Sequence, residues 1–79
     1  MYTVYVLGNR EGKLYKGRTG DMKRRLKEHN AGNTATTRKM GKVKVLYSEE
    51  FQDLEEAKKR EVYFKTAAGR RFIKKKLGL

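Results

Sequence analysis

Residues 2–17 read YTVYVLGNREGKLYKG, and this stretch predicts two strands joined by a turn. The run from Tyr2 to Leu7 consists of β-branched, aromatic and other apolar residues, which favour strands. The five residues after it supply the glycines and the asparagine that a turn requires, and residues 13–16 resume as a second strand. The pair predicts a β-hairpin, in which Tyr5 and Tyr15 share one face if the register permits.

The middle of the chain predicts one helix and one further strand. A helix is expected from about Met22 to Asn30, with Asp21 as its N-cap and Gly32 as its stop signal. Residues 33–39 have no amphipathic period and are rich in small polar residues, so they are expected to form a loop. Residues 42–47 alternate charged and apolar side chains before a continuous apolar end, which predicts the third strand.

The last third of the chain is expected to be helical. Asp53, with Glu56 three residues later, is related to a capping box and marks a helix start. This helix is expected to run to about Ala67, with Gly69 as its end or break. Residues 70–77 then predict a short basic amphipathic helix. Its inner side is expected to carry three apolar residues, namely Phe72, Ile73 and Leu77.

The charge of the chain indicates its partner. Its 79 residues include 21 lysines and arginines against 9 acidic residues, a formal net charge of +12. Because like charges on a small chain repel one another, such an excess indicates that a polyanion is usually nearby. Nucleic acid is the leading candidate, although an anionic membrane surface or ribosomal binding would also satisfy the charge.

The composition also limits the class of protein. Cysteine is absent, so neither a disulfide framework nor a thiolate metal site is available, and an intracellular, cytoplasmic protein is expected. The first residues show no basic leader before an apolar core, and no apolar run approaches the roughly 20 residues that span a membrane. We therefore expect no secretion signal and no membrane partner.

A carboxylate interrupts the apolar stripe of the second expected helix. Leu54, Ala57, Glu61 and Phe64 recur at helical spacing, and an apolar residue at position 61 would cost less to bury. A functional site is one explanation. The other is that Glu61 lies at the border of the stripe and forms an ion pair with a cation. Three basic residues are candidate partners for that pair, namely Arg60, Lys65 and Arg25.

Arg25 and His29 stand four residues apart in the first expected helix and therefore share a face. Taken alone this pair is weak, because a chain so rich in basic residues places an arginine near a histidine by chance. Tyr5 and Tyr15, taken alone, are explained as aromatic residues of the sheet face. Together with Glu61, however, these side chains form a set that can grip a phosphate and a metal ion.

The order of these motifs resembles the GIY-YIG nuclease superfamily over nearly the whole chain. Thr3-Val4-Tyr5 stands where the first motif ends in tyrosine, with Thr-Val in place of Gly-Ile. Tyr15-Lys16-Gly17 stands for the second motif, with lysine in place of its central apolar residue. Residues 21–30 look like the family's helix, with Arg25 at the position of the phosphate-binding arginine and His29 at the His/Tyr position one turn later.

Further motifs extend the resemblance. Arg18 matches a position that is lysine in the excision-repair relatives, and residues 57–61 resemble the segment that carries the metal-binding glutamate. Residues 65–70, Lys-Thr-Ala-Ala-Gly-Arg, are similar to a signature of the small stand-alone bacterial members. The chain lacks the Pro or Trp that many relatives carry before the third strand, and a late asparagine of the repair enzymes has no counterpart.

The resemblance implies roles for the residues in these motifs. Glu61 would hold one Mg²⁺ or Mn²⁺ ion, Arg25 would bind the phosphate, and Arg18 would add positive potential beside it. Three groups are candidates to accept or relay the proton of the attacking water, namely Tyr5, Tyr15 and His29. Four further basic residues are expected to contact nucleic acid, namely Arg38, Lys39, Arg70 and Arg71.

We therefore expect residues 1–79 to form one compact α/β domain, a three-stranded antiparallel sheet flanked by helices, resembling the GIY-YIG fold. The expected activity is metal-dependent DNA endonuclease activity of low sequence specificity, unless another protein recruits it to a site. One alternative is a nucleic-acid-binding module with the same fold and no efficient cleavage, and another is an adaptor for acidic protein partners. The nuclease accounts for the full set of Tyr5, Tyr15, Arg25, His29 and Glu61, whereas binding alone explains the charge but gives no reason for Glu61.

Overall fold

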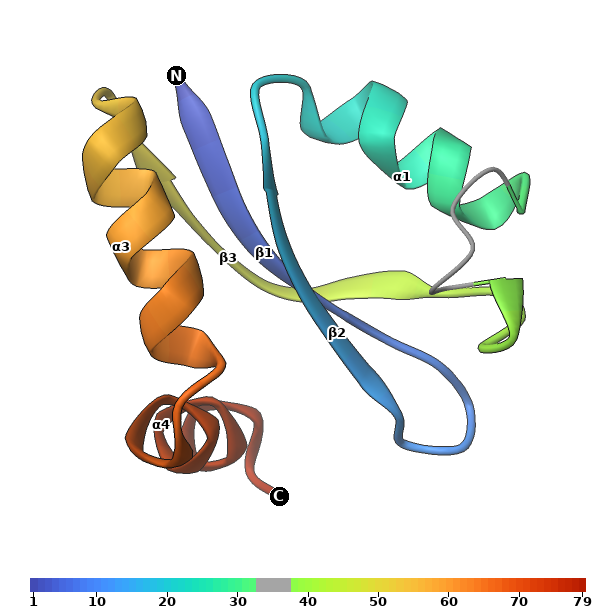
Figure 1. The fold of residues 1–79 in the computed structure, drawn as a ribbon. Helices are drawn as coiled ribbons and strands as arrows, with labels where there is room; N and C mark the ends of the chain where they lie inside the picture. Colours follow the sequence, from blue (N-terminus) through green and yellow to red (C-terminus); the bar gives the residue numbers. More distant parts are fainter. Residues whose placement is uncertain (33–37) are drawn as a thin grey trace.

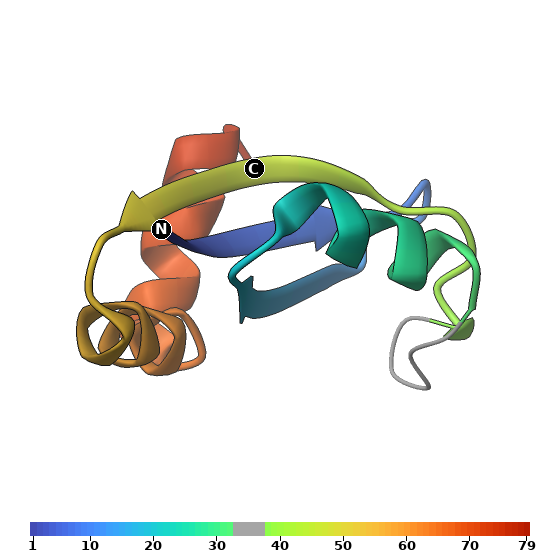
Figure 2. The ribbon, with the colours of Figure 1, turned by 90° about the horizontal axis from the view of Figure 1, so that it is seen from above.

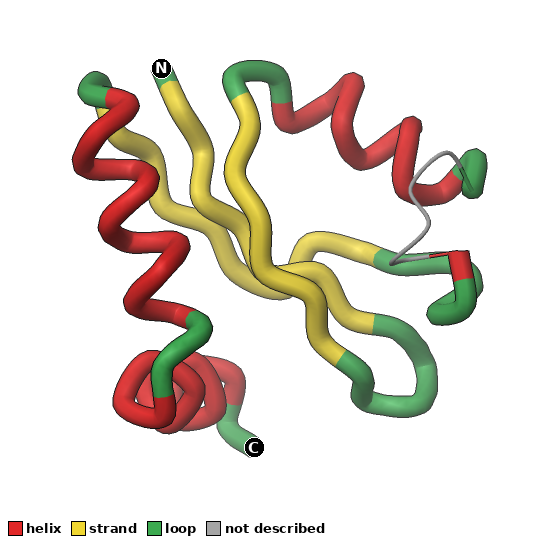
Figure 3. Tube along the Cα trace, viewed as in Figure 1, coloured by secondary structure: helices red, strands yellow, loops and turns green. Residues whose placement is uncertain are grey.

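The computed structural model of the protein describes residues 1–32 and 38–79, which form a three-stranded antiparallel sheet with helices on both sides (Figure 1). The strands are β1 (Tyr2–Gly8), β2 (Leu14–Thr19) and β3 (Lys44–Phe51), in the spatial order β2-β1-β3. The helices are α1 (Met22–Asn30), α3 (Leu54–Phe64) and α4 (Ala67–Leu77). Figure 3 shows the sheet between these helices, which confirms the expected α/β fold.

The central strand β1 serves two hydrophobic clusters, one on each face of the sheet. Val4 and Val6 pack with residues of α3 and α4, whereas Tyr5 and Leu7 pack on the side of α1. All four side chains have no exposed surface. Since successive side chains of a strand point to opposite faces, four consecutive apolar residues are required to supply both clusters. Figure 2 shows α1 apart from α3 and α4, and Figure 1 shows the sheet between them.

The register of the hairpin places the two motif tyrosines on one face. Tyr5 lies directly opposite Gly17, and Leu7 lies directly opposite Tyr15. Directly opposite residues of an antiparallel pair share a face, so Tyr5 and Tyr15 both face α1. The prediction that they share a face is confirmed.

Two helix starts and one helix end follow the sequence signals. The Asp21 carboxylate accepts a hydrogen bond of 3.1 Å from the Arg24 amide and caps α1. Asp53 caps α3 in the same way, through the Glu55 amide at 2.9 Å. Gly32 follows the last turn of α1 with a φ of 78°, a backbone conformation that glycine adopts without strain.

The third strand is longer than predicted. It begins at Lys44 and continues to Phe51, whereas the hydrophobic pattern placed it over residues 42–47. Its far end pairs with the start of β1, since Phe51 lies opposite Tyr2. The pairing with β1 extends the strand through polar residues that carry no strand signal of their own.

The boundary between the last two helices also differs from the prediction. α3 ends at Phe64, and the Thr66 side chain caps α4 by accepting a hydrogen bond from the Gly69 amide. The prediction that Gly69 ends a helix was therefore wrong, because Gly69 lies in the first turn of α4. Any side chain there would overlap the carbonyl oxygen of Tyr63, so this glycine allows α4 to pack closely on the end of α3.

The expected inner side of the last helix is confirmed. Ile73 is fully buried, and Phe72 and Leu77 pack against the same cluster. Of the loop expected at residues 33–39, residues 33–37 lie outside the described part of the chain, and Arg38 and Lys39 are exposed.

Candidate functional site

Three rings meet on the face of the sheet that α1 covers. The Tyr5 hydroxyl oxygen lies 3.0 Å from Nε2 of His29, which is the last-turn histidine of α1. The Tyr15 ring centroid lies 5.0 Å from that of His29 and 6.3 Å from that of Tyr5. Tyr5 and His29 are buried, whereas Tyr15 is half-buried. The structure therefore brings together three of the five predicted catalytic residues.

Arg25 joins this group from one turn earlier on α1. Its guanidinium hydrogen-bonds the Tyr5 hydroxyl and also Glu28, and these two bonds raise the pKa of Arg25. The Arg25–Glu28 pair has an Nη1 to Oε1 distance of 3.1 Å. Because a guanidinium can only donate, the Tyr5 oxygen accepts from Arg25 while it also hydrogen-bonds Nε2 of His29.

Burial sets the protonation of these groups. It raises the pKa of the Tyr5 hydroxyl above the ordinary value, and the hydrogen bond from Arg25 opposes this increase. It lowers the pKa of His29, and the charge of Arg25 lowers it further. At neutral pH the pair therefore consists of a neutral phenol and a neutral imidazole.

Glu61 approaches from the other helix layer. It lies on α3, its side chain is 17% exposed, and both of its carboxylate oxygens are paired. Oε1 lies 3.3 Å from Nη1 of Arg18, and Oε2 lies 3.2 Å from Nζ of Lys65. The negative charge of Glu61 still contributes to raising the pKa of Tyr5 across the sheet.

Two of the alternative partners of Glu61 are engaged elsewhere. Arg60 donates two hydrogen bonds to Glu49 on β3, at 2.7 and 3.1 Å, and Arg25 pairs with Glu28. Lys65 alone of the three predicted cations pairs with Glu61. Glu61 thus lies at the border of the apolar stripe and forms ion pairs, as the second explanation of this residue expected. Its charge also acts on Tyr5.

The edge strand β2 connects the two halves of the site. Gly17 faces α1, and its neighbour Arg18 faces α3, because side chains alternate along the strand. The Tyr5 hydroxyl extends over Gly17, whereas Arg18 holds Glu61. The five predicted catalytic side chains consequently lie around one strand rather than on one face of the sheet.

The predicted nucleic-acid-binding residues are exposed but lie in two regions. Arg70 and Arg71 are on α4, and Arg38 donates a hydrogen bond of 2.9 Å to the carbonyl of Gly32 beyond the end of α1. The charge of Arg70 lowers the pKa of Lys16 on β2, the residue that departs from the apolar centre of the second motif. That substitution of lysine for an apolar residue was the available signal.

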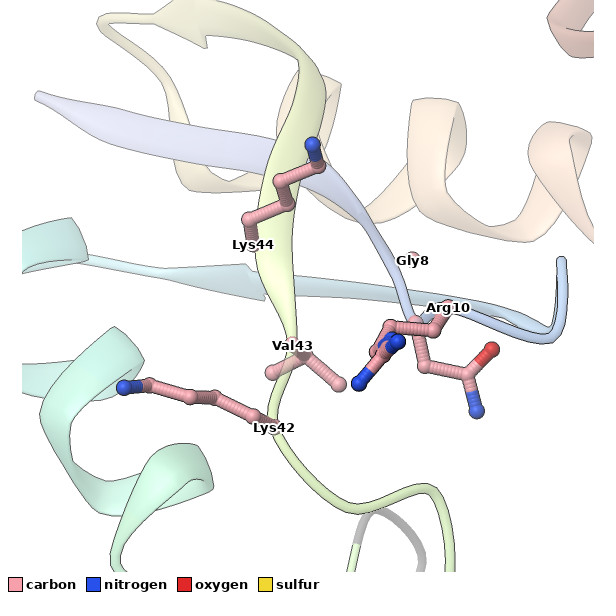
Figure 4. A pocket seen from close by; sticks show the side chains of 6 residues that line it. Gly8, Arg10, Lys42, Val43 and Lys44 are labelled. Atoms are coloured by element: carbon pink, nitrogen blue, oxygen red, sulfur yellow. The ribbon is translucent and has the colours of Figure 1, made fainter.

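A separate hollow of about 560 Å³ opens beside the end of β1. Figure 4 shows Arg10 extending toward Val43, while Lys42 extends away from it. No local sequence pattern predicts this hollow, because its lining residues come from two separate segments, residues 8–10 and 42–44. Three basic residues line it, namely Arg10, Lys42 and Lys44.

The donor set around Glu61 limits the kind of metal that fits. Within residues 1–32 and 38–79, no group of three or more His, Cys, Asp or Glu residues could enclose an ion. A single carboxylate does fit Mg²⁺, which usually keeps several waters and binds through one or two carboxylates plus substrate phosphate oxygens. The residues present therefore fit an ion shared with a substrate.

The chain belongs to the GIY-YIG nuclease family, since the family model of the GIY-YIG catalytic domain matches residues 1–76. Family membership implies a nucleic acid substrate, and nucleases of this family generally use divalent metal ions. None of the helices in the described residues is long and apolar enough to cross a membrane.

Within that family the chain is similar to the UPF0213 proteins. A UPF0213 protein of Streptococcus agalactiae is 49% identical over 63 residues, which cover 78% of this chain and 72% of the relative. One of Halobacterium salinarum is 41% identical over 66 residues, covering 82% of this chain and 86% of the relative. The solution NMR structure of UPF0213 protein BH0048 of Bacillus halodurans is 32% identical, with a TM-score of 0.57 over 94% of this chain and 81% of that one.

Proposed function

We propose that this protein is a metal-dependent DNA endonuclease of low sequence specificity. The observation that supports it most is the Tyr5–His29 hydrogen bond, with Arg25 bonded to the same hydroxyl and Tyr15 against the same imidazole. A structural aromatic cluster needs no guanidinium and no histidine. Phosphodiester cleavage needs both a cation for the developing charge and a group that handles a proton.

Each residue would then act through its position. Arg25 offers its guanidinium to the phosphate oxygens, exchanging part of its present hydrogen bonding for the stronger charge-assisted bond. Tyr15 is the partly exposed phenol, so we assign to it the contact with the attacking water. The buried Tyr5 and His29 would then relay the proton, because they are hydrogen-bonded to each other and burial keeps the imidazole neutral.

Glu61 would hold one Mg²⁺ or Mn²⁺ ion, and a bound ion would supply positive charge to the scissile phosphate and activate water. In the substrate-free protein Arg18 and Lys65 neutralise this carboxylate. With an ion held by Glu61, Arg18 would be available to bind the phosphate.

The competing proposal is a nucleic-acid-binding module that keeps the fold without efficient cleavage. The two ion pairs of Glu61 favour it, because they give this carboxylate a purely structural role. We prefer the nuclease because the module gives no reason for the Tyr5–His29–Arg25 arrangement. Neither proposal includes a separate device for sequence recognition, so a recruiting protein would supply any targeting.

Plasmid nicking separates the two proposals. The wild-type protein should nick supercoiled DNA with Mg²⁺ or Mn²⁺, and Glu61→Gln should abolish nicking while it retains the fold and DNA binding. Glu50→Gln is the matched control, because Glu50 is an exposed residue of β3 on the strand farthest from β2. Binding without cleavage of duplex, branched or single-stranded DNA by the wild-type protein would leave the binding module as the correct function.

A further inference from the structure

Lys16 occupies a position of β2 that faces a hydrophobic cluster. It lies directly opposite Val6, which packs with Phe64 and Ile73 of the helix layer formed by α3 and α4. Directly opposite residues share a face, so an apolar side chain at position 16 would extend this cluster. The chain instead has a half-buried lysine there.

Three further cations belong to the helix layer that covers this face, since Val6, opposite Lys16, packs with Phe64 of α3 and Ile73 of α4. Arg70 and Lys74 lie one turn apart on α4, and Lys65 follows the end of α3. Burial lowers the pKa of Lys16, and the charges of Arg70, Lys74 and Lys65 lower it further. The four residues come from three different segments, so the fold itself assembles this group, which we call the Lys16 cluster.

The Lys16 cluster lacks the anions that would balance it. In the described part of the chain, no carboxylate is in ion-pair contact with Lys16, Arg70 or Lys74. Lys65 alone has such a partner, which is Glu61. Like charges held together at a half-buried position oppose folding, and a local rule broken in this way marks a binding site.

We infer that Lys16, Arg70 and Lys74 form a binding site for a nucleic acid phosphate, next to the scissile phosphate that the proposed function places beside Glu61. Lys65 connects the two positions, because it belongs to the cluster and also pairs with Glu61. A phosphate would replace part of the lost solvation of Lys16 and reduce the repulsion between Lys16, Arg70 and Lys74. The inference rests on the proposed function for its ligand.

The salt dependence of DNA binding tests this site. Lys16→Met removes one charge and keeps the unbranched stem, and binding to a short duplex is measured in EDTA, where metal-dependent cleavage cannot occur. Lys59→Met is the matched control. Lys59 is an exposed residue of α3 that stands two positions from Glu61, on the opposite side of that helix.

Loss of one phosphate contact reduces the log–log salt slope by about 0.9. Between about 50 and 200 mM salt, the affinity of Lys16→Met should therefore fall roughly 3.5-fold less than that of the wild-type protein. Lys59→Met should retain the wild-type slope, and Lys16→Arg should too, since it keeps the charge. The melting temperature of Lys16→Met should equal or exceed the wild-type value, because the variant relieves repulsion and adds apolar surface.

Equal salt slopes for Lys16→Met and the wild-type protein would overturn the inference, as would equal changes in Lys16→Met and Lys59→Met. So would a Lys16→Met variant that binds DNA normally but loses binding to phosphatidylserine vesicles, which would make the site one for lipid headgroups. The binding assay does not depend on cleavage. A protein that shows the expected slopes but never nicks DNA would disprove the proposed activity and leave the phosphate site in place.

Discussion

The hydroxyl of Tyr5 lies against the backbone of Gly17, the residue directly opposite it on the neighbouring strand. A methyl group on Gly17 would stand 2.7 Å from the Tyr5 hydroxyl oxygen and 2.8 Å from the ring carbon that bears it. The absence of a side chain at position 17 thus sets the place of the first motif's tyrosine. The glycine of the second motif is a steric requirement of the site, and its φ is not in the positive range.

Gly17→Ala should therefore displace Tyr5. Because the Tyr5 ring is fully buried, it cannot swing aside freely, and we expect a loss of about 1–3 kcal/mol in the free energy of unfolding together with loss of nicking. Gly20→Ala is the control, since a methyl group there meets no atom within 4 Å. Chemical denaturation of both variants measures the effect. Equal stabilities would show that Tyr5 is not held by this contact.

The two tyrosines should differ when each is changed to phenylalanine. Tyr15→Phe is expected to reduce cleavage with little change in stability, because the Tyr15 ring stays in place beside His29. Tyr5→Phe removes a buried hydroxyl that bonds His29 and Arg25, so it should also cost about 1–3 kcal/mol of stability. Single-turnover cleavage and denaturation curves separate the two effects. If Tyr15→Phe cleaved DNA at the wild-type rate, the assignment of Tyr15 to the attacking water would be wrong.

Stability should fall as the pH drops through the range in which histidine titrates. Burial lowers the pKa of His29, so the unfolded chain takes up a proton at a higher pH than the folded protein does. The contribution of the neutral imidazole is complete above about pH 6.5, the ordinary pKa, and is lost as the pH falls through the pKa of the folded protein. The chain contains one histidine, so His29→Gln should remove this part of the pH dependence. Urea denaturation at a series of pH values would detect it, and an unchanged profile in His29→Gln would assign the effect to other groups.

Arg60 should be a residue of stability rather than of catalysis. It donates two hydrogen bonds to Glu49, and its guanidinium carbon lies 4.8 Å from the ring centroid of Phe72 and 4.9 Å from that of Tyr63. Lysine has neither the fork nor the planar face, so Arg60→Lys is expected to cost about 1–3 kcal/mol. The exposed pair of Lys58 and Glu55 provides the control, because Lys58→Ala should change stability by less than about 1 kcal/mol. Nicking per folded molecule by Arg60→Lys should equal that of the wild type.

Local signals predicted the parts of the fold that local contacts determine. The hairpin, the Asp21 and Asp53 caps and the glycine after α1 all involve residues within a few positions of one another. The end of β3 at Phe51 is set by pairing with Tyr2, far away in the sequence, so no local pattern contains it. The prediction that Gly69 ends a helix was wrong for a similar reason, because the need for glycine there comes from the packing of α4 on α3.

The candidate site shows the same division. The motifs identified the side chains, and the period of the first helix placed Arg25 and His29 together, as the structure has them. Which cation would hold Glu61 depended on how α3 lies against β2, and that relation is a tertiary one. The Lys16 cluster depends on the same packing, since its members belong to segments that only the folded chain brings together.

The alternation along β1 has a consequence for how this sequence can change. Val4 and Val6 belong to one cluster, and Tyr5 and Leu7 belong to the other, so chemistry and core are interleaved residue by residue. Insertion or deletion of a single residue within this strand would exchange the two sets and destroy both at once. The hairpin turn at residues 9–13 does not supply alternate residues to the two faces of the sheet. Variation in length among natural relatives should therefore accumulate in that turn and be absent from β1. This strand consequently provides a constant register for aligning diverged sequences.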